Sequence, residues 1–163
     1  MSEVFNADEA FEMAEKIEKN GAAFYRKAAE KAKNVTTKNL FEELARWELG
    51  HREIFATMRS ELAAGQTEPL VFDPESETGM YLKAMADGHV FDTSVDVSKF
   101  FTGRETMKDV IRTALKMERD SIIFYLGLKD VVATKQGKDK IGDIIREEMR
   151  HVAFLNKELA HND

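Results

Sequence analysis

The sequence predicts an all-α protein, a four-helix bundle of two helical hairpins joined by a long crossover that contains a short helix. Four long segments repeat apolar residues at three- and four-residue spacing, the period of an amphipathic helix. Both prolines, Pro69 and Pro74, fall in one middle segment, and the two proline-free halves favour helix. The connections are short, long and short, as two hairpins joined by a crossover require.

Local signals set the expected bounds of the helices. Asn6 and Glu9 are spaced as a capping box at the start of the first helix, and Thr102 and Glu105 have the same spacing at the start of the third. The fourth helix is expected to follow Gly137. Together with the apolar periodicity, these signals predict one domain over residues 1–163 with helices over about 6–33, 36–64, 103–132 and 138–160.

The crossover, over about residues 65–102, differs in composition from the rest of the chain. Asp73 and the proline that follows it suit the start of a helix, and Gly88 suits a C-terminal stop. The stretch GMYLKAMA between them is therefore expected to form a short helix. That helix would pack Tyr81, Met85 or both on the bundle.

Composition excludes several classes of protein. The net charge of −6 argues against an extended nucleic-acid surface. The chain has no cysteine, which excludes disulfides, cysteine-ligated zinc and iron–sulfur clusters. The acidic N-terminus lacks the long apolar run of a signal peptide, and no stretch of the sequence approaches the roughly 18 consecutive apolar residues of a membrane span. We expect a soluble, cytoplasmic protein that binds neither nucleic acid nor membrane.

The two halves of the chain repeat one another. AEKIEKNGAAFY in the first expected helix aligns without gaps to ALKMERDSIIFY in the third. The same offset pairs Glu48 with Glu148 and His51 with His151. Two similar hairpins related by a pseudo-two-fold axis are the simplest geometry that explains this repeat.

Ionisable residues interrupt the apolar stripe of every expected helix. Glu18 lies one turn from Ala14 and from Gly21, and Glu118 holds the equivalent place in the third helix. In the second and fourth helices, a glutamate and a histidine three residues apart share one helical face. Symmetric packing of the hairpins would bring six such side chains together mid-bundle: Glu18, Glu48, His51, Glu118, Glu148 and His151.

Four carboxylates in an apolar core require compensating positive charge, because burial of even one isolated charge costs several kcal/mol. The neighbouring arginines fall on other helix faces: Arg46, Arg52, Arg119 and Arg150. Two divalent cations would balance the charge. Oxygen ligands with one nitrogen per metal suit iron or manganese and disfavour copper or a thiolate-type zinc site. Iron is the expected metal, with manganese or zinc as alternatives. Glu48 and Glu148 are best placed to bridge the metals, while Glu18 and Glu118 would each bind one.

The spacing of glutamate and histidine is a weak signal when it stands alone. Glu158 and His161 have the same spacing at a C-terminus that we expect to fray, and we assign them no functional role. His89, in the crossover, is interpreted as a polar loop residue. The metal-site prediction therefore depends on the four stripes, the repeat and the charge balance together.

Two tyrosines occupy repeat-related positions near the predicted site. Tyr25 and Tyr125 follow Glu18 and Glu118 by seven residues, about two helical turns, so each hydroxyl could return to the site. Filling the core is one role open to them. A hydrogen bond to a ligand carboxylate is the other.

At these motifs the chain resembles the ferritin-like superfamily, and within it the rubrerythrin family most closely. The resemblance is carried by EKNGAAFY, ELGH, ERDSIIFY and EMRH, in that order, with the long crossover between the second and the third. It implies a non-haem di-iron centre that reacts with hydrogen peroxide or dioxygen. It also implies reduction of peroxide to water with electrons from a rubredoxin-type iron site.

Two features depart from the rubrerythrin pattern. Rubrerythrins proper carry a C-terminal domain in which cysteines bind iron, and this chain has no cysteine. The electron donor is therefore expected to be a separate molecule, such as a rubredoxin. Many rubrerythrins also have an additional glutamate one turn after the third-helix ligand, where this chain has Ser121. The expected site is more symmetric and nearer to the bacterioferritin pattern.

Three functions are compatible with the sequence. We expect a non-haem di-iron oxidoreductase that reduces hydrogen peroxide with electrons from an external donor. One alternative is a ferroxidase or iron-handling protein that uses dioxygen. The other is a non-enzymatic, metal-stabilised bundle that binds a partner. A homodimer is the expected assembly.

Overall fold

The computed structural model describes residues 7–63, 77–86 and 97–162. Within these ranges every regular element is helical, which confirms the predicted all-α class. The elements are α1 (Ala7–Lys31), α2 (Val35–Ala63), α3 (Glu77–Ala86), the short 3-10 helix η1 (Val97–Phe100), α4 (Met107–Val131) and α5 (Lys135–His161). Several residues singled out in the sequence lie outside the described residues: Asn6, Asp73, Pro74, Gly88 and His89.

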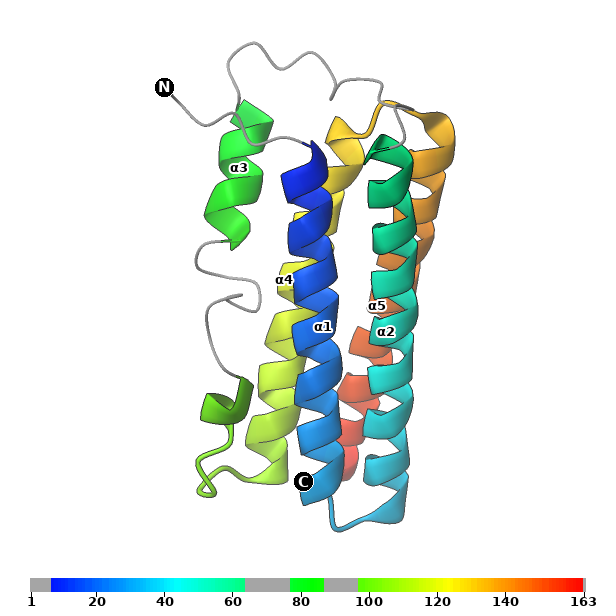
Figure 1. The fold of residues 1–163 in the computed structure, drawn as a ribbon. Coiled ribbons are helices and arrows are strands. Elements are labelled where there is room, and N and C mark those ends of the chain that lie inside the picture. The colour runs from blue at the N-terminus through cyan, green and yellow to red at the C-terminus, as the bar shows by residue number, and fades with distance from the viewer. Residues whose placement is uncertain (1–6, 64–76, 87–96, 163) are drawn as a thin grey trace.

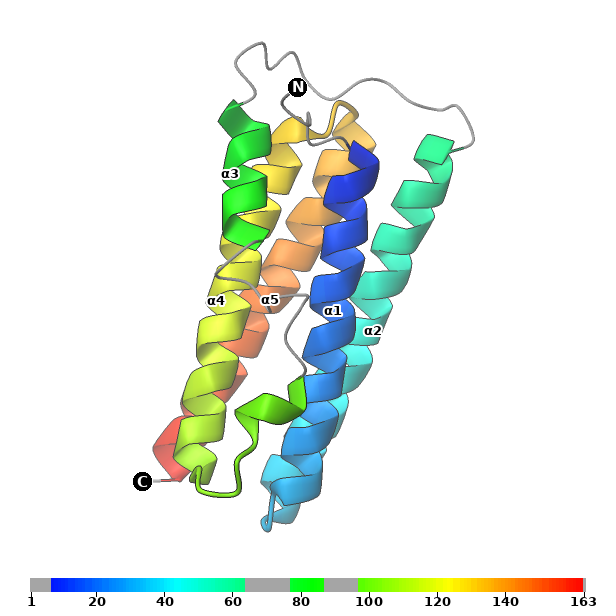
Figure 2. The ribbon, with the colours of Figure 1, turned by 60° about the vertical axis from the view of Figure 1, so that its left-hand side comes forward.

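The four long helices form the predicted bundle of two hairpins (Figure 1). α1 pairs with α2 and α4 pairs with α5, and the helices of each pair run in opposite directions (Figures 1 and 2). α2 ends and α4 begins at opposite ends of the bundle, so the connection between them must cover its length. In the described part of the chain, no helix is long and apolar enough to cross a bilayer.

Equivalent capping residues begin the second helix of each hairpin. The Asn34 side chain accepts a hydrogen bond from the backbone N–H of Thr36 at 2.7 Å, at the start of α2. The Thr134 side chain accepts one from the backbone N–H of Gly137 at 3.0 Å, at the start of α5. α5 therefore begins at Lys135, before Gly137 and not after it as expected, because the Thr134 cap satisfies one backbone donor of the first turn.

α4 begins later than the sequence predicted. Its N-cap is Thr106, whose side chain accepts from the backbone N–H of Asp109 at 3.2 Å, while Asp109 accepts from the backbone N–H of Thr106 at 2.9 Å. The predicted pair, Thr102 and Glu105, is also hydrogen bonded, with the Thr102 N–H at 2.9 Å from the carboxylate. That bond closes a turn, because Gly103 has a φ of 84° and cannot continue a helix.

The apolar stripes of the four long helices meet in one core. Its largest buried side chains are aromatic: Phe24, Tyr25, Phe41, Phe55, Phe124 and Tyr125. Phe24 packs edge-on against Tyr25, with ring centroids 5.6 Å apart, and Phe124 packs in the same way on Tyr125 at 5.8 Å. This close packing fixes the helix backbones around the middle of the bundle.

α3 packs against α4 (Figure 2). Its buried anchor is Leu82, which is 1% exposed, and Met85 is half-buried beside it. Tyr81, one of the two residues expected at this contact, is 40% exposed and donates a hydrogen bond to the Ile123 carbonyl at 3.1 Å. Gly127 permits this approach, since a Cβ there would lie 2.6 Å from the Tyr81 ring.

Gly127→Ala is expected to lower the melting temperature. The added Cβ would lie 2.6 Å from Tyr81 and 3.1 Å from Leu82, so α3 must move away from α4. Exposure of Leu82 removes burial worth up to about 1.5–3 kcal/mol. Thermal unfolding measures the loss, and faster hydrogen exchange of the α3 amides locates it.

Gly50→Ala is the matched control for this substitution. Gly50 also lies inside a long helix, but no atom stands within 4 Å of a Cβ built there. Alanine favours helix over glycine by about 1 kcal/mol, so this variant should be neutral or more stable. Equal shifts in the two variants would contradict a role for Gly127 in seating α3.

Candidate metal centre

Six ionisable side chains lie buried together near the middle of the bundle. Each is at most 3% exposed, and each of the four long helices contributes at least one of them. α1 contributes Glu18 and α4 contributes Glu118, while α2 and α5 each contribute a glutamate and a histidine. The structure thus brings together the residues that the sequence grouped: Glu18, Glu48, His51, Glu118, Glu148 and His151.

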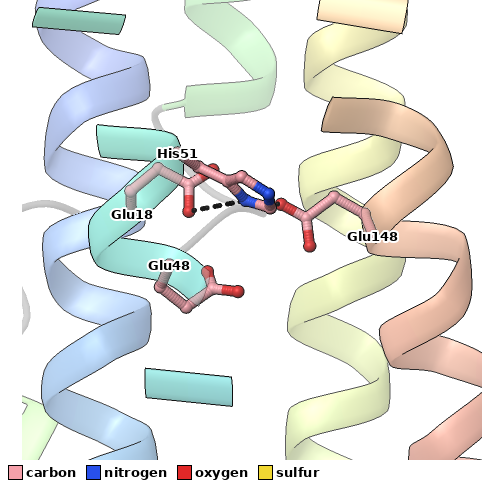
Figure 3. A group of neighbouring side chains, drawn as sticks. All are labelled: Glu18, Glu48, His51 and Glu148. Atoms are coloured by element: carbon pink, nitrogen blue, oxygen red, sulfur yellow. Dashed lines mark ion pairs between the residues drawn. The ribbon is translucent and has the colours of Figure 1, made fainter. Parts of the chain in front are cut away.

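The six side chains form two overlapping groups, in each of which the candidate ligand atoms lie within 4.8 Å of one another. The first, here named the His51 half-site, is shown in Figure 3 and consists of Glu18, Glu48, His51 and Glu148. The second, the His151 half-site, consists of Glu48, Glu118, Glu148 and His151. Glu48 and Glu148 belong to both groups, so they occupy the positions expected of bridging carboxylates.

Several buried polar atoms of this cluster make no hydrogen bond within the described residues. They are Glu18 Oε2, Glu48 Oε1, His51 Nδ1, both carboxylate oxygens of Glu148, and His151 Nδ1. His51 Nδ1 lies 3.0 Å from Glu148, and His151 Nδ1 lies 2.8 Å from the same carboxylate, but neither pair has the alignment of a hydrogen bond. Buried polar groups are normally satisfied, so convergent oxygen and nitrogen atoms without partners fit metal ions.

A tyrosine of α1 hydrogen bonds to the glutamate of α4, and a tyrosine of α4 hydrogen bonds to the glutamate of α1. The Tyr25 hydroxyl donates to Glu118, and the Tyr125 hydroxyl donates to Glu18 at 2.5 Å. Both rings are also fully buried in the core, so the structure combines the two roles considered for them. Burial, and then the neighbouring carboxylates, raises the pKa of both hydroxyls well above the ordinary value, which keeps them protonated as donors.

Gly21 and Ser121 occupy equivalent positions one turn beyond Glu18 and Glu118. A Cβ on Gly21 would lie 2.7 Å from an oxygen of Glu48, so the absent side chain makes room for that carboxylate. Ser121 is buried, and its hydroxyl donates to the Met117 carbonyl of its own helix at 3.0 Å. Neither position adds a carboxylate to the six residues.

The outward-facing sides of the two histidines have different neighbours, which the sequence analysis did not anticipate. His51 Nε2 lies 2.7 Å from a carboxylate oxygen of Glu147. The His151 ring instead stacks on Trp47, with centroids 5.0 Å apart and an interplanar angle of 6°. The repeat contained the signal for this difference, because its offset pairs Trp47 with Glu147.

Glu158 and His161 lie apart from the cluster and belong to neither half-site. The expectation of a frayed end is wrong for Glu158, which is 9% exposed and accepts a hydrogen bond from the Thr37 hydroxyl. α5 stays helical through His161, whose side chain is exposed. The contact between Glu158 and Thr37 joins the last turns of α5 to the start of α2.

Burial and mutual repulsion control protonation of the metal-free cluster. Desolvation, followed by the charge of neighbouring glutamates, raises the pKa of Glu18, Glu48 and Glu118. Burial also acts to raise the pKa of Glu148, but the adjacent histidines outweigh it and leave this pKa below its ordinary value. Burial lowers the pKa of each histidine, yet the surrounding carboxylates raise it above the usual range.

This balance has a chemical consequence. Without metal, both histidines hold protons and part of the carboxylates are neutral, so protons supply the positive charge that the cluster needs. Metal ions would displace these protons, because imidazole and carboxylate bind metal only when deprotonated. The side chains that hold protons in the metal-free protein are thus the same ones that are candidate metal ligands.

Comparison with known proteins identifies the family. The Rubrerythrin family model matches residues 9–159, which include all six clustered residues. The chain is also similar to a protein of Thermotoga maritima described as ferritin-like and diiron-carboxylate, with a TM-score of 0.76, 25% sequence identity and coverage of 97% of each chain. The curated proteins contain no significant match. With its family match across the bundle and its buried glutamates and histidines, this chain belongs to the rubrerythrin family.

Proposed function

We propose that this protein is a non-haem di-iron oxidoreductase that reduces hydrogen peroxide with electrons from an external donor. The observation that supports it best is the convergence of four glutamates and two histidines in two overlapping groups, with buried atoms that lack hydrogen-bond partners. Membership of the rubrerythrin family supports the same reaction type.

Each half-site offers a complete ligand set. Glu18 and His51 would bind one metal ion, Glu118 and His151 would bind the other, and both shared glutamates would contact both ions. Four carboxylates balance two divalent cations, and the neutral imidazoles add no charge. Oxygen ligands with one imidazole per metal suit iron well.

The protein's own groups prepare this centre for peroxide. When bound, two ferrous ions supply two electrons. Reduction of one hydrogen peroxide to two waters consumes these two electrons and two protons. Tyr25 and Tyr125 hold Glu118 and Glu18 in place and keep a proton at each hydroxyl beside the cluster. The aromatic core limits access of bulk water, which strengthens the electrostatic interactions inside.

The electrons must arrive from another iron protein or a comparable donor. The chain has no cysteine, so these 163 residues cannot bind iron in a rubredoxin-type site. A separate rubredoxin is the proposed donor.

Iron oxidation by dioxygen is the second candidate function, with ferrous iron as the substrate. Its specific support is the symmetric set of six residues. Gly21 adds no side chain, and the Ser121 hydroxyl bonds to its own helix, so neither position supplies a seventh ligand.

The choice of oxidant is tested by stopped-flow absorbance of reduced, iron-loaded protein. Hydrogen peroxide should oxidise it faster than dioxygen does, because peroxide needs two electrons and dioxygen needs four for full reduction. Steady turnover should require added reduced rubredoxin. Faster oxidation by dioxygen, with continued uptake of ferrous iron, would favour iron oxidation instead.

Ligand substitutions test the site itself. Glu148→Ala removes a carboxylate common to both half-sites and should abolish most metal binding, whereas Glu18→Ala should remove roughly half. His161→Ala is the control, since this exposed histidine ends α5 outside both half-sites. Metal content by mass spectrometry measures the outcome. Unchanged content in both glutamate variants would show that the ligands are misassigned.

Metal removal should destabilise the protein more at pH 7 than at pH 5. The pKa values of Glu18, Glu48 and Glu118 are raised in the folded metal-free protein, so their linkage stabilises the fold at low pH and is lost as pH rises through the raised values. The histidines act in the same direction once the pH exceeds their ordinary pKa. The depressed pKa of Glu148 matters only below about pH 4.5.

Bound metal reinforces this trend, because its affinity falls as protons compete for the ligands. The difference in melting temperature between loaded and metal-free protein should therefore shrink from pH 7 to pH 5. Differential scanning fluorimetry of both forms measures it. Equal melting temperatures at pH 7 would count against a buried metal centre.

A further inference from the structure

We propose that Glu147 is a positioning residue for His51, and that it makes the His51 half-site the first of the two to take up metal. The His151 half-site, which has Trp47 in the equivalent place, is the second. This inference rests on the proposed function, because it requires two metal ions in one cluster.

Both ring nitrogens of His51 have carboxylate neighbours. Nδ1 faces the cluster, 3.0 Å from Glu148 and 3.6 Å from Glu18. Nε2 lies 2.7 Å from Glu147, whose other oxygen lies 3.6 Å from the guanidinium of Arg150. When metal displaces the proton of Nδ1, the remaining proton stays on Nε2 and is donated to Glu147, so the lone pair of Nδ1 is directed into the half-site. Glu147 thereby fixes both the tautomer and the ring orientation that metal binding needs.

His151 presents Nδ1 to the cluster in the same way, 3.3 Å from Glu48 and 2.8 Å from Glu148. Its outer side differs, because the ring stacks on Trp47 and none of the described residues accepts a hydrogen bond from Nε2. His151 also borders a cavity of about 310 Å³ whose other lining residues are Trp47, Glu147, Arg150 and Phe154. Stacking restrains the plane of this ring but leaves its tautomer unselected.

The remaining parts of the two half-sites match closely. Each has one glutamate of its own that accepts from a tyrosine, and both share Glu48 and Glu148. The carboxylate behind His51 is therefore the main difference that acts on a ligand. Loss of such a partner behind a metal-binding histidine typically costs 10–100-fold in metal affinity. The His51 half-site should bind metal tighter by about that factor.

The test is a calorimetric titration of metal-free protein with Co²⁺. Wild type should show two steps whose affinities differ by about 10-fold or more. Glu147→Leu should weaken the tighter step until the two steps merge, whereas Glu147→Gln keeps an acceptor oxygen and should preserve the order. Trp47→Phe is the control, since it retains a stacked ring and should leave the tighter step unchanged. Circular dichroism verifies that each variant is folded.

A second readout identifies which half-site fills. Trp47 is the only tryptophan in the chain and stacks on His151, so its emission reports that histidine. With Zn²⁺ as the probe, emission should change mainly with the second equivalent. Two equal steps in wild type, a tighter step unaltered in Glu147→Leu, or an emission change with the first equivalent would overturn the inference. Absence of any binding to wild type would overturn the proposed function as well.

Discussion

Burial of four carboxylates in one apolar core is the constraint on which the rest of this structure depends. An isolated buried carboxylate is strongly unfavourable, and four together repel one another. The fold accommodates them by placing two histidines among them, by directing two tyrosine hydroxyls to the outer glutamates, and by leaving several polar atoms convergent and without hydrogen bonds. Convergent polar atoms without hydrogen bonds suit the binding of cations, whereas in the metal-free protein they lower the stability of the fold.

The same constraint explains how the hairpins associate. The helices within each hairpin contact one another extensively, while contacts between hairpins are fewer. The crossed tyrosine bonds lie between hairpins, since Tyr25 and Glu118 come from α1 and α4. Metal ions held by residues of both hairpins would add to this junction. The cluster is thus part of what joins the two halves of the bundle.

Much of this arrangement could be predicted from the sequence, because helical periodicity determines which residues share a face. The internal repeat relates Glu18 to Glu118 and Glu48 to Glu148, so convergence of these side chains follows from symmetric packing. The predicted start of α4 was wrong because two capping pairs, Thr102 with Glu105 and Thr106 with Asp109, have the same spacing. The positive φ of Gly103 excludes the first pair as the helix start. Contacts that depend on tertiary packing, such as the stacking of Trp47 on His151, are not encoded in local spacing.

Neither hairpin holds a complete half-site alone, since the His51 half-site takes Glu148 from α5 and the His151 half-site takes Glu48 from α2. Two identical hairpins could assemble such a centre only as a dimer, and each change in one would then appear twice. Joining both hairpins in a single chain removes that restriction. Equivalent positions can then carry different residues, as Trp47 and Glu147 do, so covalent fusion is what allows the two symmetry-related half-sites to acquire separate properties.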